Sequence, residues 1–287
     1  MARDAFLEGI VDRDLQRQIV TVLTYVGTVI VNVAAVVLPL GGVTTAELSD
    51  RFPVLVTPAN YVFGIWSVIY LLLLVFTVAQ ALPAMRPNAT LRRLGYLPAL
   101  TGILNALWVL LWQFQVFLFT VPVMLALLVT LIVIHRRLRE PAGTREAPAF
   151  GWLVVLPFSV YLGWITVATI ANIAQMLYLA GYRGWPLGEE AWAVFVLAVG
   201  LGIAATMVVR ERDVAYGAVI VWACAGIAVK QSDVAVAAWM AAGCAVVVAV
   251  LIIGVVRGRL PGGARPSGGP ATEAHRPRGL PPGRTWA

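Results

Sequence analysis

The sequence predicts an all-α, polytopic membrane protein in which about eight helices form a bundle. The 287 residues are 60% hydrophobic and only 12% charged, and the mean hydropathy of +0.86 far exceeds that of a soluble domain. Apolar runs of about 20 residues, the length needed to cross a bilayer core, recur along the chain. Arginines gather between alternate runs. Lipid is therefore the expected solvent for most of the chain.

Each expected helix is an apolar stretch bounded by polar or Gly/Pro-rich sequence. The first has 22 residues and follows a segment of mixed charge. It is longer than the apolar part of a signal peptide, so we interpret it as a retained spanning helix. The seventh is the shortest. The eight stretches cover residues 19–40, 60–82, 97–115, 118–135, 151–178, 191–209, 214–229 and 234–256.

Positive residues predict the orientation, because arginine and lysine accumulate in cytoplasmic loops. With the N-terminus inside, 18 of the 21 positive residues fall in inner segments, and only Arg51, Arg183 and Lys230 fall outside. Removing one helix would invert every later loop and destroy this asymmetry. The pattern favours an even number of spans and both termini in the cytoplasm. We expect an integral, multi-pass protein, with a bacterial inner (plasma) membrane as its location.

The ends of the chain are expected to lie outside the bilayer. Residues 1–18 form a cytoplasmic N-terminal segment. Residues 258–287 are rich in Gly, Pro and Arg and lack apolar periodicity, which predicts a disordered cytoplasmic tail. The net charge of +7 arises from these separate segments and from no compact basic surface, so we expect no nucleic-acid partner.

Ionisable residues are scarce inside the expected spans. All 14 acidic residues lie at helix ends, in loops or in the tails, while His135 lies at a helix end and His275 in the tail. Cys224 and Cys244 have no second ligand at metal-binding spacing. Proton-coupled pumps and metalloenzymes need such groups, so both classes are disfavoured. We expect no catalytic residues, no metal site and no cofactor.

Aromatic and carboxamide side chains recur at helical spacing on one face of three expected helices. These faces could line one cavity, although tryptophan and tyrosine also mark membrane interfaces and asparagines also bond between helices. An unpaired amide in hydrocarbon costs several kcal/mol, so the asparagines should face protein or a cavity. Spacing alone leaves a ligand pocket and simple helix packing equally favoured. The faces comprise Phe63, Trp66 and Tyr70; Asn105, Trp108 and Trp112; and Tyr161, Trp164, Ala168, Asn172 and Gln175.

Three segments at these faces follow one another in a characteristic order. They are Thr57 to Tyr70 (TPANYVFGIWSVIY), Leu104 to Trp108 (LNALW), and Pro157 to Trp164 (PFSVYLGW) leading to Ala168 and Asn172. This ordered set resembles the TspO/MBR family, the tryptophan-rich sensory proteins that include the mitochondrial translocator protein.

The resemblance covers residues 19–178 and implies a five-helix TspO-like core. Residues 179–257 would then form a three-helix membrane extension, similar to that of longer relatives. The family's cavity lies beneath the loop between the first two helices and binds planar apolar molecules such as porphyrins, or sterols in some members. Carried over, the candidate ligand-binding residues are Phe63, Trp66, Tyr70, Asn105, Trp108, Tyr161, Trp164, Ala168 and Asn172, and Pro53 and Pro58 belong to the lid loop.

Two departures from the family pattern bear on the ligand. The paired prolines before the second helix are reduced to Pro58 followed by Ala59. The sterol-recognition pattern fails at Tyr178, because no Leu or Val lies two to six positions before it. A different lid is therefore expected, and cholesterol is not proposed as the ligand.

The leading hypothesis is a non-enzymatic binding or sensory protein for a porphyrin-like, planar apolar small molecule. No axial ligand for haem iron is evident, so a metal-free porphyrin fits best. The alternatives are a facilitative transporter of a small uncharged or apolar solute and an enzyme that acts on a photolabile porphyrin. Membrane lipid is the other expected partner. A ridge of small residues permits a homodimer, but packing on the chain's own helices is favoured; it comprises Ala237, Ala241, Ala245 and Ala249.

Overall fold

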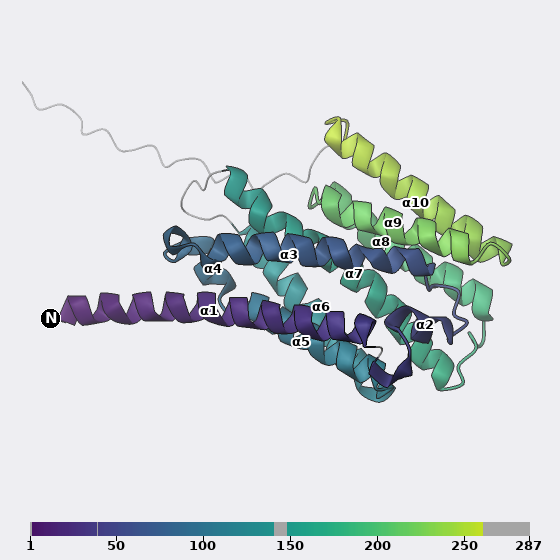
Figure 1. Ribbon diagram of the computed structural model, residues 1–287. Helices are drawn as coiled ribbons and strands as arrows, with labels where there is room; N and C mark the ends of the chain where they lie inside the picture. Colours follow the sequence, from purple (N-terminus) through teal and green to yellow (C-terminus); the bar gives the residue numbers. More distant parts are fainter. Residues whose placement is uncertain (1, 39, 141–147, 261–287) are drawn as a thin grey trace, which may run out of the picture.

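The computed structural model describes residues 2–38, 40–140 and 148–260, and within these ranges the regular secondary structure is entirely helical (Figure 1). Every expected apolar stretch is a helix. Two short helices, α2 (Thr45–Asp50) and α4 (Ala89–Leu94), lie in the connections. The long helices are α1 (Ala2–Val37), α3 (Ile65–Ala81), α5 (Leu97–Gln113), α6 (Phe117–Arg139), α7 (Pro148–Leu179), α8 (Glu189–Val209), α9 (Val214–Lys230) and α10 (Ala235–Val256).

Six of the long helices are long and apolar enough to cross a membrane, counting the 3-10 turn Asn60–Gly64 with α3. The other two, α5 and α9, have 17 residues each and are equally apolar in character. Seventeen residues of helix span about 25 Å, slightly less than a bilayer core of about 30 Å. The polytopic membrane helix bundle predicted from the sequence is confirmed.

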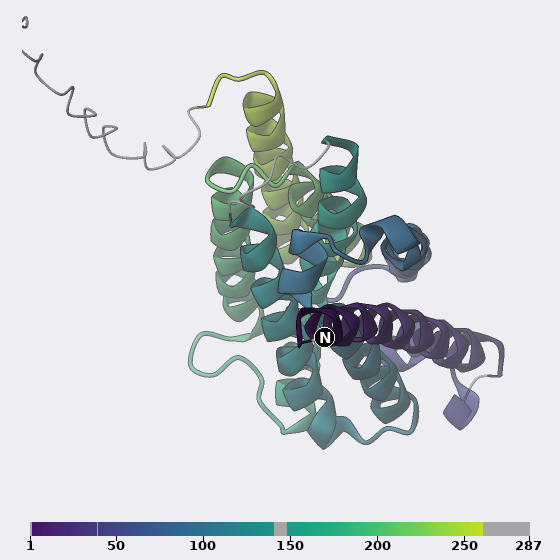
Figure 2. The same ribbon diagram turned by 90° about the vertical axis from the view of Figure 1, so that its left-hand side faces the viewer.

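Helix α7 lies at the centre of the bundle. It contacts α3, α6 and α9, whereas α1 packs on α5, and α8, α9 and α10 pack on one another. Figures 1 and 2 show α1 with α5 on one side of α7 and α10 on the other. Helix α7, the fifth expected helix, therefore lies between the side of the bundle that holds α1 and α5 and the three C-terminal helices.

Helix α1 begins at Ala2, well before the apolar run from residue 19. Its charged first part contains good helix formers and no proline, so the helix continues beyond the apolar run. The polar side chains of Asp14, Arg17 and Gln18 are buried because α3, α4 and their connection supply partners. Gln18 donates to the carbonyl oxygen of Gln80, for example, and Arg17 to that of Arg86.

Charged contacts mark one end of the bundle, which we call the arginine-rich end. They join the start of α1 to α4, α4 to the end of α6, and the end of α6 to the α8–α9 connection. This end holds the described positive residues assigned to the cytoplasm from the sequence. The contacts are Arg92 with Asp14, Arg93 with Glu140, and Arg139 with the carbonyl oxygen of Glu211.

The small-residue ridge of α10 faces the chain's own helices at its start. Ala237 and Ala241 are completely buried, and α10 contacts α9 and α8 along its length. Short side chains permit this close approach of helices. The expected C-terminal tail, residues 258–287, lies outside the described residues from residue 261 onward.

Candidate functional site

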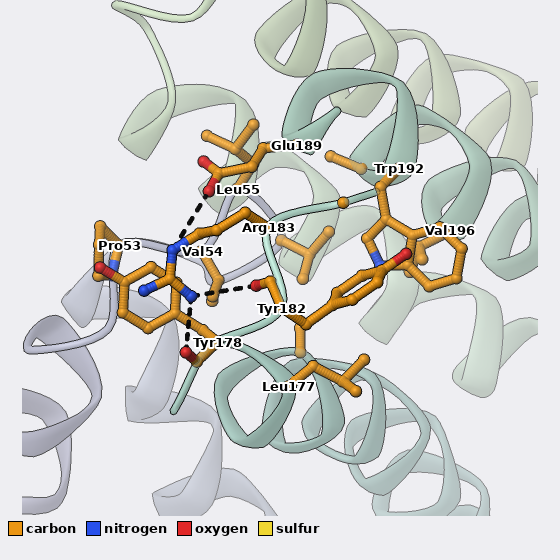
Figure 3. A pocket seen from close by; sticks show the side chains of 14 residues that line it. Pro53, Val54, Leu55, Leu177, Tyr178, Tyr182, Arg183, Glu189, Trp192 and Val196 are labelled. Atoms are coloured by element: carbon orange, nitrogen blue, oxygen red, sulfur yellow. Dashed lines mark hydrogen bonds and ion pairs between the residues drawn. The ribbon is translucent and has the colours of Figure 1, made fainter. Parts of the chain in front are cut away.

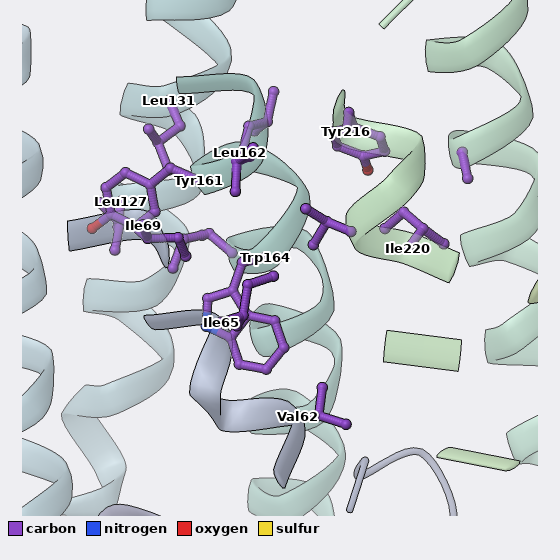
Figure 4. Packing of buried hydrophobic residues seen from close by; sticks show 14 of the residues in the cluster. Val62, Ile65, Ile69, Leu127, Leu131, Tyr161, Leu162, Trp164, Tyr216 and Ile220 are labelled. Carbon is purple, nitrogen blue, oxygen red and sulfur yellow. The ribbon is translucent and has the colours of Figure 1, made fainter. Parts of the chain in front are cut away.

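Aromatic rings from α3 and α7 meet in the interior of the bundle. The Trp66 ring lies 6.1 Å from the rings of both Tyr161 and Trp164, edge to face, and Phe63 contacts Trp164 in the same manner at 5.7 Å. Figure 4 shows Tyr161 and Trp164 on α7 among the buried apolar residues of the neighbouring helices. Spacings of three and four residues place these rings on facing sides of the two helices. The predicted convergence of the aromatic faces is therefore present.

A cavity of about 490 Å³, which we call the lid cavity, lies in front of these rings. The rings of Phe63, Trp66 and Tyr70 form one wall. Trp108 of α5 forms a second, and the C-terminal half of α1 and the start of α2 close the space. Trp66 and Tyr70 are stacked, with ring centroids 5.5 Å apart and planes 16° from parallel. This wall offers a flat aromatic surface to a ligand.

One side of the lid cavity is polar. Asn32 of α1 lines it and donates a hydrogen bond to Asn105 Oδ1, at 2.8 Å. Asn105 itself does not line the cavity. The Asn105 amide nitrogen and the Tyr70 hydroxyl are buried and complete no hydrogen bond among the described residues. Of these polar groups, the Asn32 amide borders the cavity, where a polar group of a ligand could contact it.

The α7 candidates support the cavity from behind and do not line it. Trp164 is 2% exposed and Tyr161 equally buried, both behind Trp66. Asn172 accepts a hydrogen bond from the Trp108 indole N–H, at 3.3 Å, and donates one to Thr120 Oγ1. It therefore joins three helices, which is the packing role that spacing could not exclude. Ala168 packs against the apolar core and also lies away from the cavity.

The segment between α1 and α3, residues 40–59, is the lid segment, and its helix α2 covers the lid cavity. The Thr44 hydroxyl accepts from the Glu47 N–H, while the Glu47 carboxylate accepts from the Thr44 N–H, a reciprocal cap that fixes the start of α2. Gln175 of α7 donates to the Ser49 hydroxyl at 2.8 Å. The Trp112 indole N–H donates to the carbonyl oxygen of Thr45, the first residue of α2. Helix α2 is thus attached to both α5 and α7.

A glycine allows the lid segment to turn tightly beneath α5. Gly41 has a φ of 81°, a conformation that side-chain-bearing residues avoid. A Cβ there would lie 2.3 Å from the carbonyl oxygen of Gln113, the last residue of α5. Only glycine permits this approach of the lid segment to α5.

The lid prolines lie away from the lid cavity. Pro53 borders a small cavity of about 50 Å³ between the lid segment and the α7–α8 connection (Figure 3). There Arg183 lies over the Tyr178 ring and pairs with Glu189. Pro58 packs towards Gly226 of α9. Both prolines therefore shape the contact between the lid segment and the C-terminal helices.

Helix α9 holds the lid segment through several polar contacts. Lys230 pairs with Asp50, which also accepts from Asn60. The Ala59 N–H donates to the Gly226 carbonyl oxygen at 3.1 Å. These contacts form the lid clamp. Sequence reasoning placed Lys230 in an outer loop but did not find its partner, because the pair is 180 residues apart.

The lid clamp should weaken at low pH. Burial alone would raise the pKa of the Asp50 carboxyl, but hydrogen bonds from Lys230 and Asn60 outweigh it and hold this pKa below its ordinary value. A lowered pKa in the folded state means that the stabilisation is complete above about pH 4 and is lost as the pH falls through the lowered value. Lys230→Met should remove the same contact at neutral pH.

Hydrogen exchange of the lid segment measures this effect. We expect Lys230→Met to speed exchange by up to about fivefold, because partly exposed ion pairs contribute at most about 1 kcal/mol. Arg210→Met, at the arginine-rich end, is the matched control. Equal exchange in the two variants would show that the ion pair does not hold the lid.

Sequence reasoning missed Asn32 as a site residue. It lies in the first apolar run, and a lone amide in the middle of a span is itself a signal that the residue faces protein or a cavity. The buried pair His135 and Asp213 was also missed, because both residues lie at helix ends in the sequence while the fold covers them.

Comparison with known proteins adds one finding. A family model described as TSPO-like protein matches residues 18–254. The match includes α8, α9 and α10, beyond the five helices on which the resemblance was based. No curated protein and no solved structure matches the chain.

Proposed function

The chain belongs to the TspO/MBR family, and on this basis we propose that it binds a planar, largely apolar molecule, such as a metal-free porphyrin, in the lid cavity. The observation that carries the proposal is the stacked Trp66–Tyr70 wall, faced by Trp108 across a cavity of about 490 Å³. Cavities of this size suit small-molecule ligands. The proposed role is binding or sensing, without catalysis.

Aromatic stacking supports a flat ligand. Each well-placed ring contact contributes about 0.5 to 1.5 kcal/mol beyond area burial. Rings of Phe63, Trp66, Tyr70 and Trp108 border the cavity, so several such contacts are available. The Asn32 amide could bind a polar substituent at the cavity's edge.

The lining favours a porphyrin without iron. It includes no histidine, cysteine or methionine, and the hydroxyl of its tyrosine, Tyr70, is buried away from the cavity surface. The described histidine, His135, lies at the arginine-rich end, and Cys224 and Cys244 lie on α9 and α10. The ligand would be held by its ring surface and not through a metal.

Titration of the purified protein with protoporphyrin tests the proposal. We expect saturable quenching of tryptophan fluorescence and an affinity about tenfold lower in Trp66→Ala, which removes half of the stacked wall. Trp239→Ala is the matched control, because Trp239 is 78% exposed on α10. Linear, unsaturable quenching, or equal affinities of the two variants, would contradict binding at this wall.

A further inference from the structure

A second large cavity lies at the arginine-rich end and has no part in the proposed porphyrin site. Its volume is about 670 Å³, and it lies between α6 and α8, with residues of α7 and α9 completing it. Leu162 and Thr166 of α7 border it, whereas Tyr161 and Trp164 face α3. The two cavities thus lie on different faces of α7. We call this one the groove.

The groove has an apolar and a charged part. The apolar part follows α6 and α8 and is formed chiefly by Leu128, Ile132, Ile203 and Met207. The charged part, at the ends of these helices, contains His135, Arg136, Arg139, Glu140 and Glu211. An apolar slot that ends in charges matches an amphiphile whose chain lies in the bilayer and whose head lies at the interface.

Most of the charges in the groove already have partners. Arg139 donates to the Glu211 carbonyl oxygen and lies 3.6 Å from the buried Asp213 carboxylate. Asp213 also accepts from Ser159 Oγ, at 2.7 Å. Glu140 lies 3.9 Å from Arg93. These pairs neutralise Arg139, Asp213 and Glu140, while the Glu211 carboxylate lies 4.0 Å from His135 Nε2.

One cationic donor in the groove remains unused. Arg136 makes no hydrogen bond or ion pair among the described residues, although its side chain borders the groove. The Nε2 atom of His135 also completes no hydrogen bond, but it is buried and lies 4.0 Å from Glu211 Oε2, so it is not open to a ligand. The Arg136 guanidinium presents paired N–H groups that fit a phosphate.

We propose that the groove binds a phospholipid from the leaflet at the arginine-rich end, with its phosphate at Arg136. An acyl chain would occupy the space between α6 and α8. An empty apolar space would forfeit dispersion contacts with its walls, and a lipid chain restores them. A free phosphate would satisfy Arg136 but leave the apolar walls bare, which favours the lipid as source of the phosphate.

Native mass spectrometry of the delipidated full chain, titrated with defined lipids, tests this site. We expect a phosphatidylglycerol adduct that is about tenfold weaker in Arg136→Gln, the effect of losing a charge-assisted hydrogen bond. Arg210→Gln, an exposed arginine at the same end of the bundle, should bind like the wild type. Diacylglycerol, which has the same chains and no phosphate, should bind about tenfold more weakly.

A second variant tests the binding of the lipid's acyl chain separately from the binding of its phosphate headgroup. Ile203→Trp fills the apolar part without touching the charged part, and Ile203 is exposed enough for folding to be retained. It should also weaken the phosphatidylglycerol adduct. If glycerol 3-phosphate displaced the lipid at equal concentration, the groove would be an anion site only, and the proposal would be wrong. Equal binding of diacylglycerol, or equal losses in Arg136→Gln and Arg210→Gln, would also overturn it.

Discussion

Trp164→Ala is expected to lower the free energy of unfolding by about 2 to 3 kcal/mol. The ring is 2% exposed and contacts Phe63 and Trp66 edge to face. Comparable truncations in soluble cores cost about 3 to 5 kcal/mol. The lower value is expected because helix association in a bilayer depends on packing, without a hydrophobic driving force between helices. Unfolding in mixed micelles, followed by circular dichroism, measures the change.

Two variants control for the loss of the indole ring. Trp164→Phe should cost less than about 1.5 kcal/mol, because it keeps an aromatic ring and the indole N–H has no hydrogen-bond partner to lose. Trp239→Ala removes an exposed tryptophan and should leave stability almost unchanged. If Trp164→Ala were no more destabilised than Trp239→Ala, the aromatic contact between α3 and α7 would not stabilise the bundle.

The helices of this protein were predictable because the bilayer restricts the choices. A spanning segment must be apolar, helical and about 20 residues long, and each expected stretch is a helix. The true start of α1 was not predictable from hydropathy. Its first half is polar, and the partners that bury Asp14 and Gln18 lie more than 60 residues away.

The candidate site was predictable in part. Helical spacing correctly predicted that the rings of Trp66, Trp164 and Tyr161 lie close together. Spacing could not reveal which rings border the cavity and which stand behind them, because that depends on helix rotation and on the chain between α1 and α3. Asn172 illustrates this: the same stripe that suggested a ligand contact places its amide between Trp108 and Thr120.

The function of α8 to α10 could not be inferred from their composition. All three are apolar without a clear polar face, so their helical periodicity did not predict which surface of each helix contacts other parts of the protein. The fold supplies two roles. Helix α9 holds the lid segment through Lys230 and Gly226, and α8 forms one wall of the groove. Both roles depend on long-range contacts that only the fold shows.

The location of the ligand can be tested with a single engineered thiol. Ser67 borders the lid cavity one residue after Trp66, whereas its neighbour Val68, about 100° further round α3, is exposed and does not border the cavity. In a background without Cys224 and Cys244, Ser67→Cys and Val68→Cys differ by one position and by the face they occupy. A thiol-reactive probe reports the accessibility of each.

Bound ligand should shield only the thiol inside the lid cavity. With protoporphyrin at about one hundred times its dissociation constant, about 1% of the protein is free, so Ser67→Cys should react about one hundredfold more slowly. Val68→Cys should react at an unchanged rate. Binding in front of the Trp66–Tyr70 wall predicts this difference, and equal rates for Ser67→Cys with and without saturating protoporphyrin would contradict it.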